Sequence, residues 1–232
     1  PPGDESAPLR HAYLTWLVEQ VGQLSLTGID PKAASDADTR LSLSAVYTAL
    51  LTQSTDQSEG SPLPSPAGRG GRGEGLTRLS ALAQLDRHPH LVLLGDPGSG
   101  KSTFINFVAL CLAGEMLGRS EANLALLRTP LPLDPEAHRK EVKPKPQPWS
   151  HGALLPLRVV LRDFAARGLP EAGQTGTAKH LLDFIQAELD KAALGEYTAP
   201  LIQELRQQGG LLLLDGLDEV PEAQDRRAQL KQ

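Results

Sequence analysis

The chain has 232 residues, of which 40% are hydrophobic and only 4% aromatic, and its formal net charge is −5. This length predicts one α/β domain with a smaller attached piece and a core of Leu, Val and Ala. The acidic balance disfavours nucleic acid and membrane surfaces as partners. The one cysteine, Cys111, excludes an intrachain disulfide and favours a cytoplasmic setting, and no apolar run reaches the ~18 residues of a membrane span.

The N-terminal part, residues 1–50, predicts a small and mostly helical segment. Apolar residues recur at helical spacing over residues 9–26, and the turn-forming residues 27–31 end that pattern. A second apolar segment at residues 41–50 fits either a helix or a strand. The opening Pro-Pro-Gly, without a Met, leads us to expect a fragment of a longer protein.

Residues 51–75 predict a linker, because they are rich in Ser, Pro, Gly and Gln and contain little to bury. The stretch GRGGRG at residues 68–73 allows two interpretations. One is an RGG-type RNA-binding tract, and the other is a flexible tether. With two arginines and no interleaved aromatic residue, the tether is favoured.

The rest of the chain, residues 76–232, is expected to form one α/β domain. Leucines at every third position predict a helix over residues 76–85, which leads into the sequence HLVLLGDPGSGKST at residues 90–103. Its apolar run, residues 91–94, predicts a buried strand. A metal site at Asp86, His88 and His90 is disfavoured, because one short turn makes a poor cage for an ion.

The glycine-rich segment at residues 95–102 matches G-x-x-x-x-G-K-[ST], a pattern that binds phosphate between a strand and a helix. Glycines allow backbone N–H groups to turn inward around an anion, and the helix dipole adds positive charge. Lys101 is expected to reach the β- and γ-phosphates, and the Ser102 hydroxyl is expected to bind Mg²⁺.

The middle of the chain alternates helices and strands. Helices are predicted at residues 101–117, 121–128, 177–193 and 201–208, a strand at residues 154–161, and a loop at residues 165–177. The proline-studded residues 129–152 contain a P-x-P-x-P run. An aromatic-grooved partner is one interpretation of that run, but an extended surface loop is favoured.

A second apolar strand, LLLLD, ends in Asp215 and is followed by Asp218 and Glu219. Ligands of open α/β sheets bind at the carboxyl ends of the strands, so we expect Asp215 to lie beside the glycine-rich loop and to hold Mg²⁺. Asp218 or Glu219 is expected to orient or deprotonate an attacking water. The residues alone do not decide between these two acids.

Together, GDPGSGKST and LLLLDGLDEV resemble the Walker A and Walker B motifs of the NACHT family, part of the STAND class of signal-transduction NTPases. The segment LLPLRVVLRDFA at residues 154–165 is similar to the strand that this family places between the two motifs. The resemblance implies a P-loop parallel sheet flanked by helices. The family's next strand would lie beyond Gln232, so we expect a sheet that is incomplete at the C-terminus.

The resemblance also implies a Mg²⁺-dependent ATPase switch whose ATP-bound form self-associates, with effector and sensor domains outside this region. Lys101, Asp218 and Glu219 would be catalytic, and Ser102 and Asp215 would bind the metal. The expected ATP contacts are Gly95, Asp96, Pro97, Gly98, Ser99, Gly100, Lys101, Ser102 and Thr103. A P-loop kinase and a nucleotide-binding scaffold without turnover are the alternatives; a guanine-specific GTPase is disfavoured, because no N-K-x-D follows the loop.

Overall fold

The computed structural model describes residues 6–24, 41–47, 49–52, 79–131, 144–171, 174–220 and 229. It is a mixed helix and strand fold that contains a small parallel two-stranded sheet. None of the helices in this part of the chain is long and apolar enough to cross a membrane. The linker core with GRGGRG, most of residues 129–143 and most of the polar C-terminus lie outside the described residues.

Two compact units make up the chain. The first contains residues 1–47, 95–127 and 151–232, and the second contains residues 48–94 and 128–150. Both sequence motifs that carry the expected chemistry fall within the first unit.

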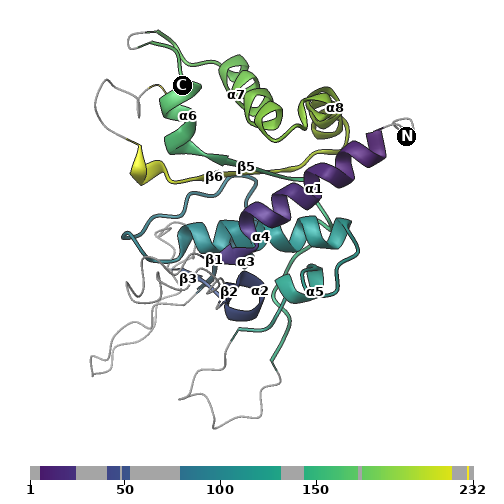
Figure 1. Cartoon of the computed structure of the whole chain (residues 1–232). Coiled ribbons are helices and arrows are strands. Elements are labelled where there is room, and N and C mark those ends of the chain that lie inside the picture. The colour runs from purple at the N-terminus through teal and green to yellow at the C-terminus, as the bar shows by residue number, and fades with distance from the viewer. Residues whose placement is uncertain are drawn as a thin grey trace, which may run out of the picture. The chain divides into compact units, whose positions relative to one another are not determined.

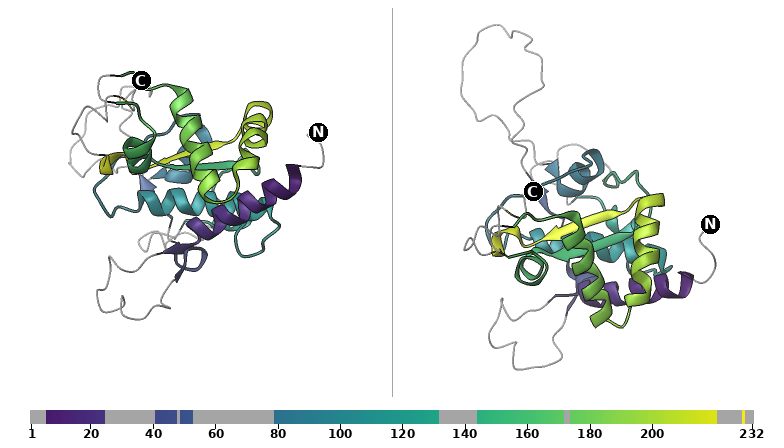
Figure 2. Two further views of the ribbon diagram at one scale, coloured as in Figure 1. Left: turned by 45° about the horizontal axis from the view of Figure 1, so that its top comes forward. Right: turned by 90° about the horizontal axis from the view of Figure 1, so that it is seen from above.

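The parallel sheet of the first unit consists of β5 (Pro156–Val160) and β6 (Leu211–Asp215), close to the predicted strands. Their register pairs Pro156 with Leu211 and Val160 with Asp215. A parallel pair needs a long crossover, and helices provide it here. Figures 1 and 2 show α4 (Lys101–Met116) on one side of the pair and α7 (Ala178–Lys191) with α8 (Thr198–Gln208) on the other. β6 leaves Leu212 and Leu214 46% exposed each.

The predicted loop at residues 165–177 is partly wrong, because α6 (Leu161–Arg167) follows β5 directly. Leu161, Phe164 and Ala165 have the i, i+3, i+4 spacing of one helix face, and all three are buried. The Phe164 ring packs edge-on against Phe184 of α7, with centroids 5.3 Å apart. The sequence did not predict this short helix, because it follows the β-branched residues that end β5 without an intervening turn.

Helix α1 (Ala7–Val21) packs against α4 within the same unit. Its buried face is formed by Tyr13, Leu14, Leu17, Val18 and Val21. The α4 helix is apolar on nearly all sides because α1, the sheet and the short α5 (Leu124–Leu127) surround it. The N-terminal helix therefore covers the helix that begins with Lys101 and Ser102.

Polar groups in the N-terminal half of α1 fix its position. The buried Tyr13 hydroxyl donates to the Pro156 carbonyl at 2.8 Å, and burial raises the Tyr13 pKa above its usual range. Arg10 donates through Nε to Glu204 Oε1 at 2.9 Å, and the Tyr197 hydroxyl donates to Oε2 of the same carboxylate at 3.2 Å. These contacts connect α1 to β5 and α8.

Replacing Tyr13 with Phe is expected to lower the free energy of unfolding by about 0.5–1.5 kcal/mol, because it removes this buried hydrogen bond without changing the ring packing. Urea titration followed by circular dichroism measures the change. Tyr197→Phe serves as the control, since Glu204 keeps its bond to Arg10 in that variant. A larger loss for Tyr197→Phe would contradict the anchoring role of Tyr13.

Smaller elements complete the first unit. The strands β1 (Gln23–Leu24) and β2 (Leu41–Ser42) pair in antiparallel fashion, and α2 (Leu43–Val46) follows them. The sequence left helix or strand open for residues 41–50, and the structure contains a short strand followed by a short helix there. The Tyr47 ring stacks on Phe107 of α4 at 3.7 Å between centroids.

The second unit contains β3 (Leu51–Thr52), β4 (Leu79–Ser80) and α3 (Ala81–Arg87). The Ser80 hydroxyl caps α3 by accepting a hydrogen bond from the Ala83 N–H at 3.2 Å. The side chain of Gln147 contacts Ser80 and donates to the Thr129 carbonyl at 2.7 Å. These contacts anchor the P-x-P-x-P run, which has no regular secondary structure.

The predicted buried strand at residues 91–94 is wrong for this structure. These residues have no regular secondary structure, and Val92 and Leu94 are 73% and 88% exposed. An extended segment becomes a strand only when another backbone pairs with it, and none of the described residues does so here. The apolar run therefore forms neither a strand nor a buried segment in the described residues.

Candidate functional site

The glycine-rich loop makes a tight turn into α4. Gly98 has φ +78° and Gly100, the residue before the helix, has φ +89°, a left-handed backbone that favours glycine. The Ser99 N–H donates to the Asp96 carbonyl at 3.1 Å and closes the turn. The helix starts at Lys101, as the sequence predicts, so its positive dipole end faces the loop.

Lys101 folds back over this loop. Its Nζ donates to the carbonyl oxygens of Gly95 at 2.7 Å and Asp96 at 3.0 Å. Oδ2 of Asp218 lies 3.6 Å from the same Nζ. The ammonium is therefore held at the mouth of the turn, where an anion entering the loop would meet it.

Ser102 and Asp215 lie in direct contact, although 113 positions separate them in the sequence. The Ser102 hydroxyl donates to Oδ1 of Asp215 at 2.7 Å. Asp215 ends β6, and only 8% of its side chain is exposed. The structure thus brings the expected metal-binding pair together at the carboxyl end of the sheet.

Asp218 and Glu219 are separated from Asp215 by a turn. Gly216 adopts φ +80°, and Leu217–Glu219 form a single 3₁₀ turn after it. About half of each acidic side chain is exposed. Asp218 faces Lys101, whereas Glu219 Oε2 accepts a hydrogen bond from Arg162 Nη1 at 3.2 Å. The two candidate acids therefore have different cationic partners.

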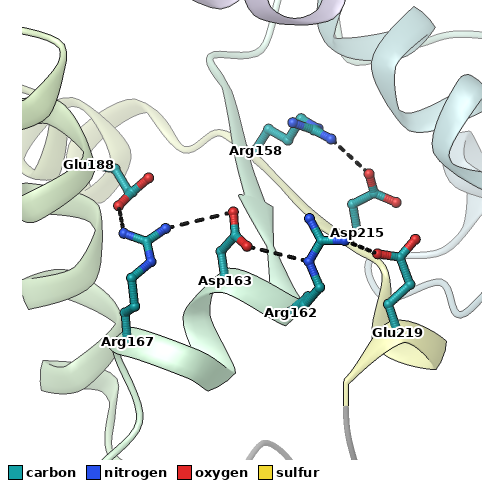
Figure 3. A network of polar contacts seen from close by, with 7 residues as sticks. All are labelled: Arg158, Arg162, Asp163, Arg167, Glu188, Asp215 and Glu219. Atoms are coloured by element: carbon teal, nitrogen blue, oxygen red, sulfur yellow. Dashed lines mark hydrogen bonds and ion pairs between the residues drawn. The ribbon is translucent and has the colours of Figure 1, made fainter. Parts of the chain in front are cut away.

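Figure 3 shows that Arg162 belongs to a longer chain of ion pairs. Its Nε lies 3.5 Å from Asp163 Oδ1, and Arg167 lies 3.7 Å from the other oxygen of Asp163. Arg167 also donates to Glu188 of α7 at 2.5 Å. A polar chain thus runs from Glu219 across α6 to α7, but its members are largely exposed and each pair adds little stability.

Two arginines of the site, Arg158 and Arg162, received no functional role from sequence reasoning. Arg158 donates from Nη2 to Oδ2 of Asp215 at 2.9 Å. The available signal was a charged residue inside the apolar run PLRVV, where a buried strand would carry only apolar side chains.

The oxygen donors of the site are of the kind that Mg²⁺ binds. Ser102 and Asp215 offer a hydroxyl and a carboxylate oxygen, the hard ligands that Mg²⁺ prefers when water and phosphate complete its shell. These residues therefore fit the ion. Among the described residues, no group of three or more His, Cys, Asp or Glu side chains forms a separate metal cage.

Cys111 does not contribute to this chemistry. It is buried in α4, and burial raises the pKa of its thiol to about 12. The thiol is therefore protonated at neutral pH and cannot act as a nucleophile. This agrees with the interpretation of Cys111 as a small buried hydrophobe.

Comparison with known proteins supplies no family assignment for the chain. No protein-family model matches it. Neither a curated protein nor a solved structure matches it either. The functional interpretation consequently rests on the motifs and on the geometry of Lys101, Ser102 and Asp215.

Proposed function

We propose that the chain is the nucleotide-binding part of a NACHT-type STAND switch with a P-loop fold, which binds ATP with Mg²⁺ and hydrolyses it slowly. The contact between Ser102 and Asp215 carries this proposal. It joins the end of an apolar parallel strand to the first turn of the helix that follows a glycine-rich loop. Phosphate-binding loops with an adjacent metal-holding acid use this arrangement.

Different residues of the chain would bind the phosphates, hold the metal ion and activate the water. The loop N–H groups and the start of α4 bind the phosphates, and Lys101 moves from the loop carbonyls to a phosphate oxygen. Ser102 and Asp215 would hold Mg²⁺, which neutralises phosphate charge when bound. Asp218 or Glu219 orients the attacking water and accepts its proton. In a switch, the nucleotide state then determines whether copies of the protein assemble.

Competitive titration of the complete protein with ATP and GTP, each with Mg²⁺, tests this proposal. Adenine preference predicts a lower Kd for ATP, and the Lys101→Ala variant provides the phosphate-loop control. Equal or reversed affinities would remove the adenine assignment. Binding of neither nucleotide would reject the proposed function as a whole.

A further inference from the structure

Both carboxylate oxygens of Asp215 are engaged by neighbouring side chains. Oδ1 accepts from Ser102 at 2.7 Å. Oδ2 accepts from Arg158 Nη2 at 2.9 Å, the contact drawn in Figure 3. The side chains of Arg158 and Asp215 are only 22% and 8% exposed. This ion pair is therefore less screened by solvent than the exposed pairs of Arg162 and Arg167.

The position of Arg158 in the sheet imposes a desolvation penalty on its charged side chain. It lies in the middle of β5, in register with Leu213, where an apolar side chain would pack without a desolvation penalty. Its buried Nε also has no hydrogen-bond partner among the described residues. A partly buried ion pair with an unsatisfied donor is weak evidence for a stabilising role. The presence of the Arg158 guanidinium is better explained by its effect on the charge of Asp215.

We propose that Arg158 is a positioning residue that neutralises Asp215 and competes with a divalent cation for its Oδ2 side. This inference rests on the proposed function of Asp215 as a metal ligand. Without a cation paired to it, the Asp215 carboxylate would repel phosphate entering the loop beside Ser102. Arg158 offsets that charge, so the loop accepts nucleotide phosphate before any metal is present.

Neutralising Arg158 consequently shifts two affinities in opposite directions. In Arg158→Gln, the amide can still donate to Asp215, but the positive charge is absent. We expect this variant to bind Mn²⁺ alone about tenfold more tightly, because the competing cation is removed. We expect it to bind ADP in the presence of EDTA about tenfold more weakly, because the Asp215 charge is no longer offset.

The experiment measures Mn²⁺ binding without nucleotide by electron paramagnetic resonance, and ADP binding in EDTA by calorimetry, on the full chain. Arg158→Lys keeps the charge and should restore both values to within about threefold of the original chain. Arg167→Gln is the matched control. It removes one positive charge from the same unit, but the native Arg167 pairs with Asp163 and Glu188 and not with Asp215. Because solvent screens this exposed charge, the Mn²⁺ and ADP affinities of Arg167→Gln should stay within about twofold of those of the original chain.

Arg158→Met provides a second neutral variant, and circular dichroism checks the fold of each. The proposal would be overturned if the Mn²⁺ and ADP affinities of the neutral Arg158 variants shifted in the same direction or did not shift. Equal shifts of these affinities in Arg167→Gln would also overturn it. Unfolding of both neutral variants would make Arg158 structural and would overturn it as well. A chain that binds Mn²⁺ but neither ADP nor ATP contradicts the proposed function instead, and the Mn²⁺ comparison then decides the role of Arg158 by itself.

Discussion

Lys101→Ala is expected to weaken ATP binding by about 1.5–3 kcal/mol, roughly 10- to 150-fold in Kd, the contribution of one hydrogen bond to a charged group. The ammonium already lies over the glycine-rich loop, 2.7 Å from the Gly95 carbonyl. A phosphate in that loop would replace the carbonyl oxygens as its acceptor. Calorimetric titration with ATP and Mg²⁺ measures the loss.

The control for this change is Lys179→Ala. Lys179 is 79% exposed in α7 and pairs only with the nearby Asp183 among the ion pairs described. Its removal should leave ATP affinity unchanged, which separates a local contact from a change in net charge. Lys101→Ala should also keep its helical circular dichroism signal, because α4 is held by its buried face. Unfolding of this variant would mean that Lys101 is structural.

The acids after β6 are expected to separate into two classes. Asp215→Asn should weaken Mg²⁺-dependent ATP binding itself, because Asp215 contacts Ser102 and would hold the ion. Asp218→Asn or Glu219→Gln should instead leave ATP bound but slow its hydrolysis by about 10²–10⁴-fold, the contribution of a water-positioning acid or base. In a switch protein, the trapped ATP form should also be the assembled one.

Full-length variants should be measured for ATP retention, phosphate release and oligomer size by light scattering. Unchanged turnover in both Asp218→Asn and Glu219→Gln would remove the water-activating role from this turn. Slower turnover with no change in oligomer size would keep the ATPase and reject the switch. Arg162→Gln is an informative companion, since it frees Glu219 while leaving Asp218 beside Lys101.

Local pattern was sufficient to predict most of the elements in the first unit. The α4 helix begins at Lys101, and β6 ends at Asp215, where the apolar runs and the flanking glycines predict these boundaries. Such boundaries depend on neighbouring residues, so the sequence contains the information for them. The approach of Asp215 to Ser102 was also predictable, because the carboxyl end of a parallel strand is where α/β sheets place ligands.

Only the tertiary structure determined which side chains share a partner. Arg158 reaches Asp215 because β5 and β6 pair in a register that places both residues on one face of the sheet, and that register depends on residues 57 positions apart. The sequence also did not predict that α1 covers α4. Residues 91–94 illustrate the converse: their apolar pattern is local, but strand formation requires a second backbone, and pairing of that kind is a property of the assembled fold.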